Sequence, residues 1–274
     1  MTRSGLVASL ALAALSLLAN PARAEQKPLW ELGMGAAGLH LPHYRGSDQT
    51  HDWLLPTPYV IYRGDFLKAD RDGARAVLVQ TSRVDVDLSL GATAPTRSSD
   101  DEARRGMSDL APTLEFGPNV NFTLARGTGW KLDLRTPLRA AFTLESHPRN
   151  IGWVFTPNLN LDITDWHGWN FGAQVGPEFG DRRYHGYYYD VKPEEATATR
   201  AAYTAPGGAA GARLTLAAAR RFTHWWAGAF LRLDTLRGAS FLDSPLVRQR
   251  ENTSFGVALV YVFANSSTLV DVDE

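Results

Sequence analysis

The sequence has no cysteine among its 274 residues. Disulfide bonds therefore cannot hold the chain together, which excludes the class of small, disulfide-stapled secreted domains. Beyond residue 24 the chain also lacks an apolar run of the roughly 20 residues that a membrane-spanning helix needs. Lysine and arginine (28) nearly balance aspartate and glutamate (29), so no excess of positive charge indicates nucleic acid. The length permits one large all-β domain.

The first 24 residues have the pattern of a secretory signal peptide. Arg3 precedes an apolar run from Leu6 to Ala19, Asn20-Pro21 interrupts it, and Ala22-Arg23-Ala24 supplies an A-x-A cleavage site. A single membrane anchor is the alternative, but the run is shorter than a spanning helix. We predict cleavage after residue 24, which removes two arginines and changes the formal charge from -1 to -3.

The mature chain alternates apolar and polar residues with a period of two. The clearest stretch places Trp130, Leu132, Leu134, Leu138, Ala140, Phe142 and Leu144 on one face and Lys131, Asp133, Arg135 and Arg139 on the other. About twelve such strands are predicted, near residues 29–40, 53–62, 65–71, 74–80, 83–95, 108–124, 130–144, 151–164, 168–181, 208–220, 224–236 and 252–263. The third and fourth have the weakest pattern, and without that hairpin ten remain, which keeps an even count.

Connections between these strands alternate between short and long. Short ones lie near residues 63–65, 81–82, 126–128, 165–167 and 222, and long ones at 40–52, 96–107, 145–150, 182–207 and 237–251; only a turn at 72–73 departs from this order. Outer-membrane barrels have short periplasmic turns and long extracellular loops. A soluble β-sandwich would also alternate, but its loops need not sort by length. The predicted fold is a closed antiparallel transmembrane β-barrel at residues 25–264, in the outer membrane of a Gram-negative bacterium.

Aromatic residues agree with this polarity. Trp30, Trp130, Trp169 and Trp225 open strands, and Phe263 closes the last one, so all five would form a girdle at the periplasmic rim. In most such barrels an aromatic residue ends the chain, whereas here residues 265–274 follow Phe263. We predict a short periplasmic tail, frayed as chain ends commonly are.

The face opposite the lipid carries both signs of charge. Its members are Glu31, Asp85, Asp87, Glu115 and Glu178 with Lys131, Arg135, Arg139, Arg213 and Arg232. A selective pore needs a ring of one sign, so mixed charges favour paired groups. A three-residue turn at 126–128 would place Glu115 opposite Arg139 on neighbouring strands, and we predict that these two form an ion pair in the lumen.

Three further patterns bear on a metal site, a binding surface and a catalytic site. His40 and His43, with His51 and Asp52 nearby, match no spacing of a closed metal site, so no metal or other cofactor is predicted. A segment that mixes cations and tyrosines, typical of binding surfaces, lies in a predicted extracellular loop: Arg182, Arg183, Tyr184, His185, Tyr187 and Tyr188. The preferred interpretation of this segment is an extracellular strand extension whose tyrosines pack on neighbouring loops. No G-x-S-x-G elbow occurs, which disfavours a barrel enzyme.

Four stretches resemble the MipA/OmpV family of outer-membrane proteins: Gly38 to Asp48, Pro58 to Asp70, Asp181 to His185, and Asp243 to Val247. The resemblance spans the mature chain. It implies a barrel without catalytic residues, and a scaffold that joins a lytic transglycosylase to a bifunctional penicillin-binding peptidoglycan synthase. Other members are linked to adhesion, osmotic response and antibiotic susceptibility. A scaffold, a small-solute pore and a barrel enzyme therefore stay open, in that order of preference.

Overall fold

The computed structural model describes residues 25–64, 67–70, 73–81 and 83–272. The predicted signal peptide lies outside them, as do residues 65, 72 and 82 of three predicted turns. Within the described part, no helix has the length and apolar character needed to cross a membrane.

Strands dominate the chain, and each of the twelve predicted segments contains at least one. They are β1 (Glu25–Pro28), β2 (Trp30–Pro42), β3 (Thr50–Arg63), β4 (Leu67–Asp70), β5 (Gly73–Gln80), β6 (Val84–Thr93), β7 (Thr113–Gly127), β8 (Trp130–Arg135), β9 (Leu138–Thr143), β10 (Asn150–Phe155), β11 (Asn158–Trp166), β12 (Trp169–Gly180), β13 (Gly208–Arg221), β14 (Trp225–Thr235), β15 (Glu251–Asn265) and β16 (Leu269–Val272).

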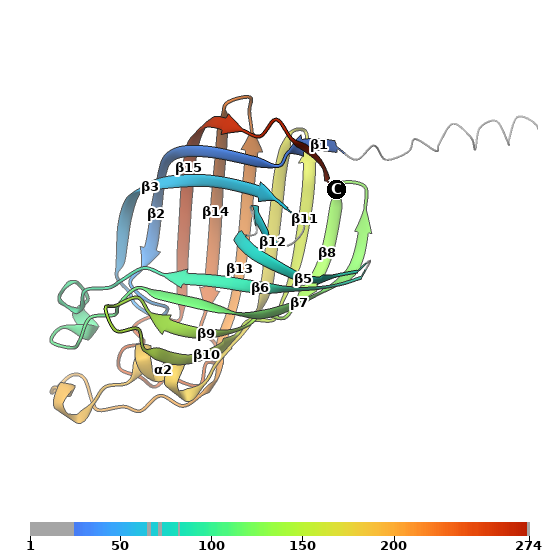
Figure 1. Cartoon of the computed structure of the whole chain (residues 1–274). Helices are drawn as coiled ribbons and strands as arrows, with labels where there is room; N and C mark the ends of the chain where they lie inside the picture. Colours follow the sequence, from blue (N-terminus) through green and yellow to red (C-terminus); the bar gives the residue numbers. More distant parts are fainter. Residues whose placement is uncertain (1–24, 65–66, 71–72, 82, 273–274) are drawn as a thin grey trace, which may run out of the picture.

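All strands of the large sheet pair antiparallel, and the pairing returns to its starting point. From β2 it runs in sequence order to β7, then through β8 and β11 to β12, and on to β15, which pairs with β2 (Figure 1). β8 and β9 are one predicted strand divided at Thr136-Pro137, and β10 and β11 are one divided at Thr156-Pro157. Proline has no N–H for the ladder, which explains both breaks. The cycle therefore has twelve strand positions.

Side chains sort by face as the period of two requires. On β15 the outward-facing Val257 is 61% exposed and Leu259 53%, whereas the inward-facing Ser254 is fully buried. Trp130, Trp225 and Phe263 lie at strand ends next to short turns and are exposed. The apolar belt thus faces outward and the polar groups face a central space, here called the lumen.

The register between β7 and β8 differs from the prediction by two residues. Glu115 lies opposite Ala141, not Arg139. The turn consists of Thr128 and Gly129, with a positive φ of 72° at the glycine, and a bulge at Leu124 takes up the odd residue. The predicted three-residue turn is therefore wrong. The alternation of apolar and polar residues gave no indication of where the bulge would lie.

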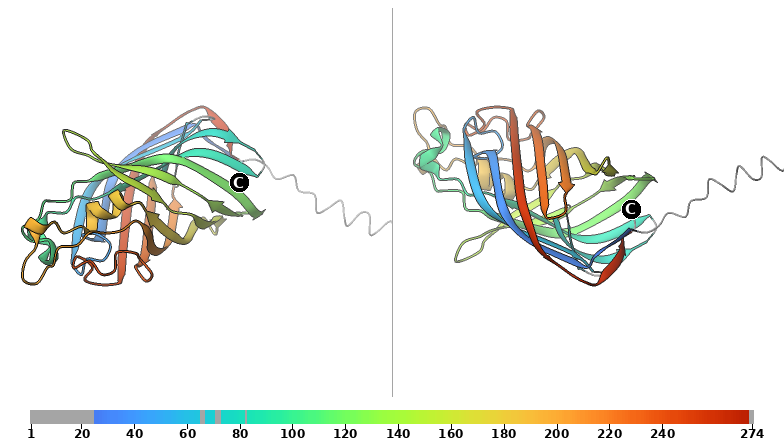
Figure 2. Two further views of the ribbon diagram at one scale, coloured as in Figure 1. Left: turned by 90° about the horizontal axis from the view of Figure 1, so that it is seen from below. Right: turned by 90° about the horizontal axis from the view of Figure 1, so that it is seen from above.

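The two ends of the barrel differ. β1 and β16 pair with each other, from Glu25↔Val272 to Pro28↔Leu269, at the end where the short turns lie (Figure 1). The residues after Phe263 are therefore not frayed over 269–272. At the other end the long loops gather around α2 (Arg182–Tyr189), as the further views also show (Figure 2). The predicted strand extension at this segment is wrong, because the chain forms a helix there.

Candidate functional site

Helix α2 closes the loop end of the lumen. Asp181 caps it, because its Oδ1 accepts the backbone N–H of Tyr184 at 2.7 Å. The helix then turns Tyr184, His185 and Tyr189 into the interior, where all three are buried. A cap followed by aromatic residues at positions three, four and eight explains why this segment is a buried helix and not an exposed strand.

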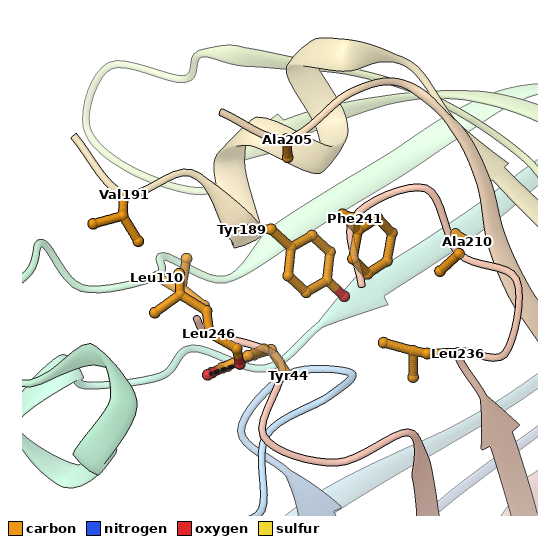
Figure 3. Packing of buried hydrophobic residues seen from close by; sticks show 10 residues of the cluster. Tyr44, Leu110, Tyr189, Val191, Ala205, Ala210, Leu236, Phe241 and Leu246 are labelled. Carbon is orange, nitrogen blue, oxygen red and sulfur yellow. Dashed lines mark hydrogen bonds between the residues drawn. The ribbon is translucent and has the colours of Figure 1, made fainter. Parts of the chain in front are cut away.

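An apolar cluster packs around the helix (Figure 3). The Tyr189 and Phe241 rings stack with centroids 3.8 Å apart, and the His185 ring meets Phe241 edge-on at 4.6 Å. The Tyr44 hydroxyl donates to the Leu246 carbonyl at 2.8 Å. The buried members are Tyr44, Leu110, Tyr189, Val191, Ala205, Ala210, Leu236, Ala239, Phe241 and Leu246. They come from four separate loops, from α2 and from the start of β13, so the cluster joins these segments into one unit. The cluster and α2 together are here called the plug.

A hydrogen-bonded chain connects the plug to the wall. The Tyr184 hydroxyl donates to Glu115 Oε1 at 2.9 Å, and Glu115 Oε2 pairs with Arg139 Nε at 3.1 Å. Arg139 also donates to Ser89 and Thr156, each at 3.2 Å. Burial raises the pKa of Tyr184 well above its usual value of 10, so the hydroxyl stays protonated and donates. Despite the shifted register, the structure brings Glu115 and Arg139 together along a diagonal.

A second charge cluster lies where the first long loop enters the lumen. Arg45 pairs with Glu178 at 2.5 Å and with Asp234 at 3.0 Å. Arg213 pairs with the same two carboxylates, at 3.3 and 2.8 Å, and Arg232 approaches Asp234 at 3.1 Å. Sequence reasoning placed Glu178, Arg213 and Arg232 in the lumen but missed Arg45, which comes from a loop, and Asp234.

The remaining lumen charges are paired as well. Glu31 contacts Arg63 at 2.8 Å and Arg221 at 3.0 Å, and Lys131 contacts Asp133 at 3.1 Å. The amides of Asn119 and Asn121 donate to Asp87, and Arg135 pairs with Asp162 at 3.3 Å. Charges of both signs that have partners of this kind form no ring of one sign for an ion.

A polar cavity of about 270 Å³ lies between these groups. Its wall combines amides and hydroxyls with paired charges, including Asn119, Asn158, Gln174 and Thr215 beside Arg139. Asn158 Oδ1 is buried and has no hydrogen-bond partner among the described residues. The cavity therefore has the size and chemistry to hold a small polar group.

The predicted binding segment is divided between surface and interior. Arg182 and Arg183 are exposed, and they bind Asp190 and the Asn150 carbonyl within the same loop region. Tyr184 and His185 are buried, Tyr187 hydrogen-bonds Ala111, and Tyr188 packs edge-on against Tyr187. Most of the segment thus packs within the plug.

The histidines in and beside the first long loop make ring contacts and hydrogen bonds. His40 Nδ1 lies 2.6 Å from Asp52 and stacks on Phe255, while His43 Nδ1 lies 3.0 Å from the buried Asp101. Across the described chain, no three side chains of the metal-ligating kinds come together. These histidines thus have structural partners of their own.

Comparisons with known proteins agree on the class. The model of the family described as MltA-interacting protein MipA matches residues 34–263. Outer membrane protein OmpV of Vibrio cholerae is 24% identical over 266 residues, which cover 95% of this chain and 96% of that protein.

Two solved structures are also similar. An outer-membrane channel from Pseudomonas putida F1 has a TM-score of 0.44 at 14% identity over 89% of this chain and 99% of that one. The NanC porin has a TM-score of 0.41 at 9% identity over 83% and 98%. The family match spans most of the described barrel. The chain is an outer-membrane protein and belongs to the MipA/OmpV family.

Proposed function

We propose that the protein is a non-catalytic scaffold, which holds a lytic transglycosylase and a bifunctional peptidoglycan synthase at the inner face of the outer membrane. The family is named for an interaction with MltA and not for a reaction. The observation that carries the proposal is the plug: the Tyr184–Glu115–Arg139 chain and the apolar cluster fill the loop end of the lumen.

The turn end supplies the contact surface in this proposal. Arg126 lies at an exposed hairpin end, and Trp166 is 59% exposed beside a turn in which Asp165 and His167 have positive φ. Positive φ at residues other than glycine is uncommon and marks a tight turn, beside which Trp166 is exposed at the end of the sheet. Exposed tryptophan and arginine are the side chains that most often anchor protein partners.

Capture and conductance separate the scaffold from a small-solute pore. Protein in planar bilayers should show little steady conductance, and protein from detergent-solubilised envelopes should retain a lytic transglycosylase or a penicillin-binding synthase. Replacing Arg126 and Trp166 by serine should weaken that retention, whereas replacing the exposed loop pair Glu145 and Arg149 at the opposite end should not. Large, long-lived openings with no cell-wall enzyme in the captured fraction would refute the scaffold and establish the pore.

A further inference from the structure

Two strands of the cycle have long edges without a partner. β3 pairs with β2 along its length, but on its other side β4 pairs only with Tyr62 and Arg63. β6 likewise pairs fully with β7, but β5 reaches it only over Asp85 to Asp87. Among the described residues, no strand pairs with 50–61 or 88–93 on these sides. Figure 1 shows β3 and β6 diverging from the short strands between them.

Prolines protect the free edge of β3 from pairing. The N–H of Arg63 donates to the Leu29 carbonyl on the β2 side, and N–H groups alternate in direction along a strand. The nitrogens of Pro56 and Pro58 therefore face the free edge, where they cannot donate. Proline at an edge is a common defence against the addition of a further strand. This edge is thus unsuited to a partner strand or a second copy of the chain.

Between the Glu31–Arg63 ion pair at the turn end and the long loops, the lumen beside this edge is mainly apolar, in contrast to the charged inner face of the strands from β6 to β14. Alternation from the buried Glu31, which lies opposite Ile61, turns Leu55, Tyr59 and Ile61 inward. Leu55 is 39% exposed although it faces inward. Tyr59 packs on Trp226 with centroids 5.6 Å apart. Other inward-facing members on the neighbouring strands are Gly33, Gly35, Ala37, Leu39, Ala258, Val260 and Val262.

The polar cavity lies beside the unpaired part of β6. Its lining includes Asp87, Leu88, Ser89 and Leu90 in succession. This stretch begins where the pairing of β6 with β5 ends. An apolar surface on β3 and a polar cavity on β6 therefore flank the same interruption in the wall.

We propose that this interruption admits a membrane-borne amphiphile with a single hydrocarbon chain and an uncharged, hydroxyl-bearing head. The chain lies along Leu55 and its apolar neighbours, and the head occupies the polar cavity. An uncharged head is favoured because Arg139 already has Glu115 and Arg213 has Glu178, so an ionic head would break a pair. A hydroxyl instead satisfies the buried Asn158 Oδ1. This ligand route is independent of the scaffold function.

The absence of cysteine makes the route accessible to single spin labels. A nitroxide at Leu55→Cys, in phosphatidylcholine nanodiscs, should collide more with oxygen, which concentrates in lipid, than with a water-soluble nickel chelate. Ala258→Cys is the matched control: it is also inward and apolar, but its strand pairs on both sides. Equal oxygen accessibility at both positions would refute the opening. Disulfide-linked dimers through Leu54→Cys, 81% exposed, would also refute it and assign the edge to a second copy.

The head is tested with decyl maltoside below its micelle concentration, against decyl sulfate and decyltrimethylammonium with the same chain. Decyl maltoside should slow the alkylation of Ser89→Cys by a water-soluble maleimide, and the added change Asn158→Leu should weaken this protection about two- to tenfold, the effect of one hydrogen bond. Heat-modifiable gel mobility confirms that each variant is folded. Equal protection by the charged amphiphiles, or none by any, would overturn the assignment.

Discussion

The loop end and the turn end of the barrel are built in opposite ways. At the loop end four loops and α2 pack into a buried cluster in which Phe241, Leu236 and Leu246 are fully inaccessible. At the turn end the connections are short, Trp166 and Phe263 remain exposed, and the chain ends pair in a small ladder of their own. The longest loops therefore pack together over one end of the barrel, whereas the other end has only short turns and the ladder of the chain ends.

This difference between the ends does not match what a pore requires. A pore needs both ends open, whereas a barrel that is closed outside and accessible inside can receive partners or ligands only from the periplasm or from the membrane. The comparison stands as long as the plug is a stable unit and the turn end tolerates change. Each prediction below alters one of these two properties.

Removing the centre of the plug should have the largest effect. Phe241→Ala deletes a fully buried ring that stacks on Tyr189 and touches His185, and large-to-small changes of this kind cost about 3–5 kcal/mol. Denaturant unfolding in detergent should show the loss, and bilayer conductance should rise. Trp166→Ala at the turn end should change stability by less than about 0.5 kcal/mol, as exposed sites usually do. Similar losses for the two variants would abolish the contrast between the ends.

The wall between the ends provides the next test. Leu134 faces outward between Leu159 and Phe122, near the middle of its strand position. Leu134→Arg should destabilise the barrel by about 2–4 kcal/mol, the cost of arginine at the bilayer midplane. Asp133→Asn should be tolerated, because an amide oxygen can still accept from Thr123. If the arginine variant folds into bilayers like the wild type while the asparagine variant does not, the assignment of faces is inverted.

Most of the fold could be predicted because membrane strands follow simple rules. Alternation predicted which face of each strand points outward, and loop lengths predicted that short turns lie at one end of the barrel and long loops at the other. Even the weak hairpin at 65–80 is present as β4 and β5. The register was harder to predict. The two-residue turn at 128–129 and the bulge at Leu124 together moved Glu115 by two residues, which kept its face but changed its opposite residue to Ala141. A shift by two preserves alternation, so the pattern contains no signal that would detect it.

The site could be predicted only in part. Inward charges on strands, such as Arg139 and Glu178, follow from the period of two. Arg45 and Phe241 come from loops, where no period applies, and their contacts depend on how distant loops meet. One local signal was available: Asp181 three residues before Tyr184, with aromatic residues at helical spacing, indicates a capped helix.

Removal of the N-cap of α2 should have a smaller effect on stability. Asp181→Ala removes the acceptor for the Tyr184 N–H, and loss of such a cap costs about 1 kcal/mol. The expected result is faster amide exchange over residues 182–189 with little change elsewhere. Asp243→Ala, an exposed aspartate of another loop, is the matched control and should leave exchange in the helix unchanged. Unchanged exchange in the Asp181 variant would show that packing alone holds the helix.

Acid should loosen the plug through His185. Its Nδ1 lies 2.8 Å from the Pro206 carbonyl, to which it donates, and its buried Nε2 has no partner among the described residues. Burial lowers the pKa of His185 below its usual 6.5, although Glu178 and Asp181 act to raise it; Arg45 adds to the lowering.

An unfolded plug therefore binds a proton at a higher pH than the folded plug. This contribution to stability is fully present above pH 6.5 and is lost as the pH falls through the lower, folded pKa. The protection of amides 182–189, after correction of each exchange rate for its intrinsic value, should accordingly fall between pH 7.5 and about 5.5, a range above the usual titration of carboxylates. His185→Gln cannot titrate, so its exchange, corrected for the intrinsic rate, should be the same at both values. Acid-induced loosening that persists in His185→Gln would assign the effect to another group and leave the plug's stability independent of this histidine.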